Sequence, residues 1–190
     1  MSAVRLVFLG AGSMRCGPPI IGALAGYFGE RELEVRLFDP DDERLELMGR
    51  LATASFLMEA APHRVALFTD YSDALEGAEL VILAIGESAA RRILGEGSPV
   101  GRDQAIGEAT ERLARSFPDG VPVLDLTRDT NLSAEFSRLE GWPPTLSATE
   151  SRSLAFQILR WIHGEEPAHM LTHQEEQSPV RAWLDASIPR

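Results

Sequence analysis

The chain has 190 residues, a single cysteine and a net charge of −11 at pH 7. This length suits one domain with an appendage, one cysteine excludes an internal disulfide, and the negative charge argues against a nucleic-acid partner. No stretch approaches the roughly 20 apolar residues of a membrane span, and residues 1–5 lack the basic start of a signal peptide. We therefore expect a cytoplasmic protein that has no membrane partner.

Apolar runs typical of strands alternate along the chain with segments of helical spacing. The predicted strands are residues 4–9, 34–38, 64–69, 79–85 and 121–126, with a short sixth strand at 145–148. The predicted helices begin at Pro18 and at Asp41 or Asp42, and others cover 73–77, 103–117, 131–139, 153–163 and, weakly, 180–184. The glycine-rich residues 88–101 predict a long loop.

This succession predicts an α/β fold, a doubly wound, mostly parallel Rossmann-type sheet with helices on both faces and a short helical C-terminal extension. We expect residues 1–150 to form the Rossmann-like domain and residues 151–190 the helical extension with its polar tail. In the long helix after Asp42 the inward side chains are expected to be Leu45, Met48, Leu51, Ala52 and Phe56.

The first predicted strand runs directly into a glycine turn, Gly10-Ala11-Gly12. Strand, glycine turn and helix form the context in which such a turn indicates a phosphate site. Gly10 permits the tight turn. Gly12 has no side chain that would hold a pyrophosphate away from the backbone, and the amides at the start of the next helix can face the phosphates. Arg15 stands where the usual third glycine would be. The pattern predicts phosphate binding, now or in the ancestry, and a plain structural turn is the alternative.

Asp39 ends the second predicted strand, where an acid can accept hydrogen bonds from the adenosine ribose. Asp41 and Asp42 follow and disfavour a 2′-phosphate, so the sequence favours NAD over NADP, with Arg44 as the nearby counter-argument. The alternative is that these acids only cap the following helix, a role that suits Asp41 or Asp42.

Three segments together resemble glycoside hydrolase family 4, the NAD- and manganese-dependent 6-phospho-glucosidases and galacturonidases of the lactate and malate dehydrogenase superfamily. They are GAGS after the first strand, LFDPDDERLE after the second, and TDYSDALEGAELVILAIG across the third and fourth. The resemblance covers residues 4–150. It implies a dinucleotide as partner and NAD as cofactor, with these binding residues: Gly10, Gly12, Ser13 and Met14 for the pyrophosphate, Asp39 for the ribose, and Ile85 and Gly86 near the adenine or nicotinamide ribose. Asp70 would correspond to the acid that closes the third strand.

The chain also departs from that family. Family members are more than twice as long, and of their NFTNP-like turn after the fifth strand only Thr127 remains. Their metal is held by a cysteine after the sixth strand, where this chain has SATES around Thr149, and its one cysteine, Cys16, lies in the phosphate loop. The manganese site is therefore not recognisable. The resemblance implies NAD binding by a truncated relative, without metal-dependent glycosidase activity.

Other residues give weaker indications of chemistry. His163, His169 and His173 could bind zinc or nickel, or could belong to a solvated polar tail. Cys16 near a helix start could be reactive, or simply packed. The candidates for contacting an anionic substrate are Arg91, Arg92 and Thr127, although adjacent arginines are usually just exposed to solvent.

Three functions fit the sequence. The protein is a family 4-like NAD-binding protein, a small NAD-dependent oxidoreductase acting on an anionic substrate, or a non-enzymatic oligomerising or sensing module that has lost the cofactor. We also expect a homodimer, because Trp142, Trp161 and Trp183 have little remaining core to enter. The alternative is that the 153–163 helix folds back on its own sheet and buries Trp161 and Trp183.

Overall fold

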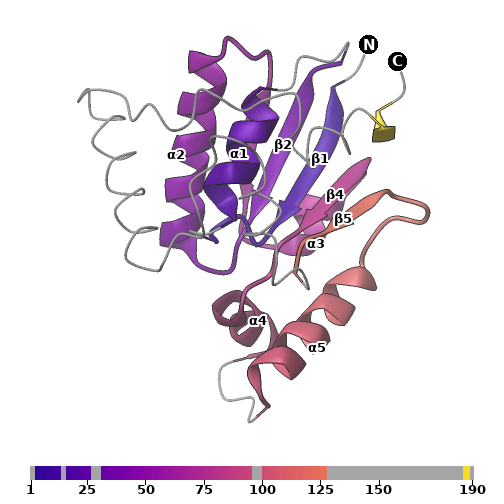
Figure 1. Ribbon diagram of the computed structural model, residues 1–190. Coiled ribbons are helices and arrows are strands. Elements are labelled where there is room, and N and C mark those ends of the chain that lie inside the picture. The colour runs from indigo at the N-terminus through magenta and orange to yellow at the C-terminus, as the bar shows by residue number, and fades with distance from the viewer. Residues whose placement is uncertain (1–2, 14–15, 27–30, 96–99, 128–185, 189–190) are drawn as a thin grey trace.

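The computed structural model describes residues 3–13, 16–26, 31–95, 100–127 and 186–188 (Figure 1). Strands and helices alternate along these residues. In chain order they are β1 (Val4–Leu9), α1 (Gly17–Ala25), β2 (Leu33–Phe38), α2 (Asp42–Met58), β3 (Arg64–Phe68), α3 (Tyr71–Leu75), β4 (Leu80–Leu83), α4 (Glu87–Leu94), α5 (Arg102–Ala114) and β5 (Val123–Asp125).

The strands form one sheet in the order β3-β2-β1-β4-β5, and every neighbouring pair is parallel. β1 pairs with β2 from Val4↔Leu33 to Leu9↔Phe38, and with β4 from Leu6↔Leu80 to Leu9↔Leu83. The chain builds outward from β1 in one direction and then returns to build in the other. The direction of winding therefore reverses between β1 and β4.

Helices cover both faces of the sheet, which makes three layers (Figure 1). Because successive side chains of a strand point to opposite faces, Leu6 and Phe8 of β1 pack with α1 and α2, whereas Val7 and Leu9 pack with α3, α4 and α5. All four side chains are fully buried. This arrangement confirms the predicted doubly wound, parallel α/β fold.

α2 shows why the sequence predicted its helix well. Asp41 is the N-cap, and its carboxylate accepts a hydrogen bond from the Arg44 amide at 3.2 Å, so this acid is the cap that the sequence left open between Asp41 and Asp42. The side chains at helical spacing that were expected to face inward are all buried: Leu45, Met48, Leu51, Ala52 and Phe56.

One predicted segment is wrong. Residues 88–101 were expected to form a loop, but Glu87–Leu94 is the helix α4. Its inward face consists of the small side chains Ala89 and Ala90, which give a weak apolar pattern, and a Glu87–Arg91 ion pair of 3.0 Å supports one turn of the helix. The glycines that favoured a loop lie mainly after the helix, beginning with its C-cap Gly95, which has a φ of +98°.

The predicted elements at 131–139, 145–148, 153–163 and 180–184 lie outside the described residues, so these elements and the division at residue 150 stay predictions. Close to the C-terminus, Ile188 is buried in the core on the α1 and α2 face of the sheet. None of the helices within the described ranges is long and apolar enough to cross a membrane.

Candidate functional site

The turn after β1 is held between the ends of its two neighbouring strands. The amides of Gly10 and Ala11 both donate to the Phe38 carbonyl of β2, at 2.9 and 3.0 Å. Gly10 has a φ of +86°, and a Cβ there would lie 2.5 Å from the Ala84 carbonyl oxygen that follows β4. Only glycine fits this position without moving the backbone of another strand.

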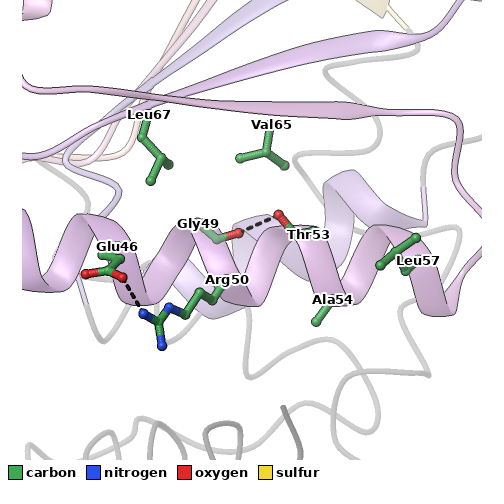
Figure 2. Close-up of a pocket in the computed structure, with 8 residues that line it drawn as sticks. All are labelled: Glu46, Gly49, Arg50, Thr53, Ala54, Leu57, Val65 and Leu67. Carbon is green, nitrogen blue, oxygen red and sulfur yellow. Dashed lines mark hydrogen bonds and ion pairs between the residues drawn. The ribbon is translucent and has the colours of Figure 1, made fainter. Parts of the chain in front are cut away.

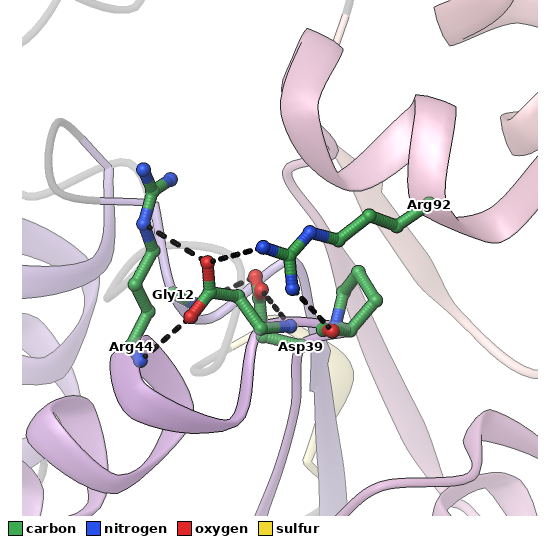
Figure 3. A network of polar contacts seen from close by, with 6 residues as sticks. Gly12, Asp39, Arg44 and Arg92 are labelled. Carbon is green, nitrogen blue, oxygen red and sulfur yellow. Dashed lines mark hydrogen bonds and ion pairs between the residues drawn. The ribbon is translucent and has the colours of Figure 1, made fainter. Parts of the chain in front are cut away.

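The turn also contacts the acid that follows β2 (Figure 3). The Gly12 amide donates to Asp39 Oδ2 at 2.9 Å, and a Cβ on Gly12 would lie 2.6 Å from Asp39 Cγ. The other oxygen of this carboxylate, Oδ1, accepts from the Asp41 amide at 3.0 Å. Two features that lie 27 residues apart in sequence are therefore joined at the carboxyl ends of adjacent strands.

Asp39 is only 4% exposed. Burial, which penalises the charged form, raises the pKa of its carboxyl group above the ordinary value. The hydrogen bonds from the amides of Asp41 and Gly12 act in the opposite direction, because they favour the carboxylate, but burial outweighs them. The Asp39 carboxyl group is thus a buried hydrogen-bond acceptor rather than an exposed charge.

The start of α1 differs from what the sequence predicted. Its first-turn amides were expected to face a phosphate, but the Gly17 amide donates to the Ser13 carbonyl at 2.7 Å, and Pro18 and Pro19 have no amide hydrogen. The Ser13 hydroxyl accepts from the Cys16 amide at 3.2 Å. The two prolines could have indicated this from the sequence, because proline favours the start of a helix but has no amide hydrogen to donate to an anion.

The segment after β4 contains the remaining expected binding residues. Ile85 is buried, with its Cδ1 3.1 Å from the position of a Cβ on Gly10. Gly86 is the N-cap of α4. A Cβ on Gly86 would have no atom within 4 Å, so the backbone borders open space at this position. Met14, which belongs to the predicted phosphate loop, lies outside the described residues.

The three residues expected to contact an anionic substrate all have partners within the protein. Arg91 pairs with Glu87 at 3.0 Å, Arg92 pairs with Asp41 at 3.2 Å, and the Thr127 hydroxyl bonds to Asp125 at the end of β5. The Arg92–Asp41 contact was missed by sequence reasoning, because that segment was assigned to a loop.

The single cysteine lies within the described residues, and the candidate metal ligands do not. Cys16 is half-buried at the N-cap of α1, whereas His163, His169 and His173 lie outside the described residues. Within the part of the chain that the structure describes, no group of three or more His, Cys, Asp or Glu residues could hold a metal ion.

A groove of about 510 Å³ lies between α2 and β3, the strand at one edge of the described sheet (Figure 2). It combines apolar side chains with the Glu46–Arg50 ion pair. Its lining residues are Glu46, Gly49, Arg50, Thr53, Ala54, Leu57, Val65 and Leu67. Because this set includes neither the glycine turn nor Asp39, the groove is separate from the candidate site.

Comparison with known proteins shows which solved structures share this fold. No family model matches the chain, and no curated protein matches its sequence. A solved structure of a 6-phospho-α-glucosidase from gut microorganisms, in complex with NAD and glucose-6-phosphate, is similar over 72% of the chain at 13% identity, with a TM-score of 0.53. The chain shares its fold.

A second structure of a 6-phospho-α-glucosidase from gut microorganisms, in complex with NAD and Mn²⁺, matches 70% of the chain at 17% identity, with a TM-score of 0.50. The chain spans 37% and 35% of the lengths of these two proteins. At the level of the fold, this similarity confirms the resemblance drawn from the sequence.

Proposed function

We propose that the protein binds NAD at the carboxyl ends of β1, β2 and β4. The observation that carries this proposal is the contact between Gly12 and Asp39, in which an amide meets a carboxylate oxygen at 2.9 Å and leaves no room for a side chain. Dinucleotide sites combine a glycine turn after one strand with an acid at the end of the next. Here the two features touch.

The sheet topology supports the same location. In open α/β sheets, ligands bind outside the carboxyl ends of the strands, at the point where the strand order reverses. That point lies between β1 and β4, beside the turn that contains Gly10. The two similar 6-phospho-α-glucosidase structures, both in complex with NAD, support the choice of ligand.

The adenosine half of the cofactor should supply more of the affinity than the pyrophosphate. Each oxygen of Asp39 accepts one amide, which leaves lone pairs for the ribose hydroxyls. The amides of Gly12 and Gly17, by contrast, already donate within the protein, and Pro18 has no amide hydrogen to offer. At these described positions, phosphate oxygens would have to displace existing hydrogen bonds.

A fluorescence titration of the full chain with NADH tests the proposal. We expect saturable binding that NAD and ADP-ribose reverse and that nicotinamide mononucleotide leaves nearly unchanged, because the mononucleotide lacks the adenosine. A titration without saturation up to about 1 mM NADH, where binding is worth only roughly 4 kcal/mol, would refute it. Displacement by nicotinamide mononucleotide as effective as that by ADP-ribose would refute the assignment to the adenosine half.

The proposal covers cofactor binding without metal-dependent glycosidase activity. It rests on the SATES segment around Thr149, which stands where the resembled family has a metal-binding cysteine. We expect no manganese-dependent cleavage of nitrophenyl 6-phospho-glycosides by the purified protein. Turnover that EDTA abolishes and manganese restores would contradict this prediction.

We also propose that the protein forms a homodimer, because three large side chains, Trp142, Trp161 and Trp183, are expected to have little core of their own chain to enter. All three lie outside the described residues. Light scattering at high micromolar concentration should give at least twice the monomer mass, and a monomer mass there would contradict the proposal.

A further inference from the structure

α4 sends one side chain across to the turn that follows β2 (Figure 3). The guanidinium group of Arg92 donates to the Pro40 carbonyl oxygen at 3.1 Å, a contact between residues 52 apart in sequence, and pairs with Asp41 Oδ2 at 3.2 Å. Arg44 Nε lies 3.5 Å from the same oxygen. Asp41 therefore meets two guanidinium groups.

The exposure of these three side chains decides which charge meets an incoming ligand. The Asp41 side chain is 16% exposed, whereas those of Arg92 and Arg44 are 43% and 47% exposed. The acid is thus covered by the two cations, and Asp39 beside it is buried. The exposed acids here are Asp42 and Glu43, in the first turn of α2.

This arrangement changes the charge balance that the sequence indicated. Asp41 and Asp42 disfavour a phosphate group on the adenosine ribose, with Arg44 alone against them. With Arg92 added from α4, two arginines instead of one stand among the four acids at the end of β2 and the start of α2, and the arginines are the more accessible partners of Asp41. The local field therefore opposes a second anion less than the sequence alone indicates.

We propose that Arg92, together with Arg44, accommodates the 2′-phosphate of NADP, so that the protein binds NADP within about tenfold of NAD. This inference rests on the proposed binding of a dinucleotide, with its adenosine ribose at Asp39. Because the Arg92 side chain is 43% exposed, its ion pair with Asp41 contributes little and can be exchanged for another anion. A guanidinium–phosphate pair is charge-assisted and fits two oxygens at once, so the exchange favours the phosphate. Arg92 is thus a specificity-determining residue for the ribose 2′ position.

The test compares the dissociation constants of NADPH and NADH for the same protein at one fixed ionic strength. In Arg92→Ala we expect the NADPH/NADH ratio of dissociation constants to rise roughly tenfold, the loss typical of one charge-assisted hydrogen bond. The dissociation constant of NADH should change less than about threefold, because NADH carries no 2′-phosphate. Arg92→Lys keeps the charge without the planar fork and should restore part of the loss.

Two further variants act as matched controls. Arg91→Ala removes the neighbouring arginine of the same helix, whose guanidinium pairs with Glu87 instead, and should leave the ratio unchanged. Asp41→Asn removes a negative charge while keeping a side-chain oxygen for the N-cap bond to Arg44, and should lower the ratio. Circular dichroism would check that each variant is folded.

The outcomes separate this inference from the proposed function. A wild-type protein that binds neither NADH nor NADPH refutes both. Binding of NADH with a ratio that Arg92→Ala leaves unchanged overturns the inference and leaves the proposed function standing. An equal rise of the ratio in Arg91→Ala also overturns it, because the effect would then come from general surface charge.

Discussion

Asp39 and Asp70 occupy equivalent places in the chain and behave differently. Each follows a parallel strand, β2 or β3, and each comes shortly before a helix. Asp39 is 4% exposed and accepts the amide of Gly12 from a different strand connection, whereas Asp70 is exposed and accepts the Ser72 amide at 2.6 Å within its own turn. One acid joins distant parts of the chain, and the other caps the helix that follows it.

The difference comes from the position of the two strands in the sheet. β2 lies beside the central strand β1, so the turn after β1 passes directly over its end, while β3 lies at the edge of the described sheet. A strand followed by an acid is therefore not enough to indicate a ribose site. The neighbouring strand must bring a glycine turn to the same end.

Replacing Asp39 by Ala should have the largest effect on the molecule. The buried Gly12 amide loses its acceptor, and leaving such a donor unpaired costs roughly 1–3 kcal/mol of unfolding free energy. NADH affinity should fall by about the same roughly 1–3 kcal/mol, because the ribose loses its acceptor as well. Urea denaturation and an NADH titration measure the two changes. Unchanged NADH affinity in a folded variant would remove Asp39 from the site.

The buried carboxyl of Asp39 should also make stability depend on pH. Since its pKa is raised in the folded protein, the folded state takes up this proton before the unfolded state does as the pH falls towards 3.8. The contribution to stability is therefore fully present below 3.8 and is lost as the pH rises through the raised pKa.

Asp39→Asn serves as the reference for this pH dependence, because it keeps the shape of the side chain without the titrating group. Between pH 3.8 and the raised pKa, the wild type should lose up to about 1.4 kcal/mol of unfolding free energy per unit rise in pH, relative to Asp39→Asn. Urea midpoints measured across the acid range give this difference. A difference that rises with pH would mean that the pKa of Asp39 is lowered instead.

Replacing Asp70 by Ala should have the smallest effect. It removes the side-chain cap of α3, and loss of an N-cap costs about 1 kcal/mol of unfolding free energy. NADH affinity should stay within about twofold of wild type, because Asp70 takes part only in its own turn. The same two measurements used for Asp39 apply, and a loss of NADH binding here would erase the distinction between the two acids.

Much of the fold could be predicted because its signals are local. β1 is apolar apart from Arg5, and the apolar side chains of α2 repeat at helical spacing after the N-cap Asp41. α4 was missed because its buried face is only Ala89 and Ala90 and because the glycines after it dominated the pattern. Small side chains can pack a short helix closely without leaving a clear apolar period.

The part of the candidate site that lies at strand ends could be predicted, because the sequence shows where the strands end. Gly12 and Asp39 were expected in one site, and in the structure the Gly12 amide nitrogen lies 2.9 Å from Asp39 Oδ2. The pairing of Arg92 with Asp41 could not be predicted, because it depends on where α4 lies relative to the end of β2 rather than on any local pattern. The loss of amide donors at Pro18 and Pro19 could have been read from the sequence and was not.

The pairing of β1 with β4 has a consequence for how the protein emerges during synthesis. β1 can pair with β2 once Phe38 has emerged from the ribosome, but its other edge stays open until Leu83 has emerged as well. A nascent chain, or a proteolytic fragment, that ends before Leu80 would carry its most apolar strand with one row of backbone groups unpaired. Such an edge is a template for association with other chains. The central strand of the finished sheet is thus the most vulnerable part of the unfinished one.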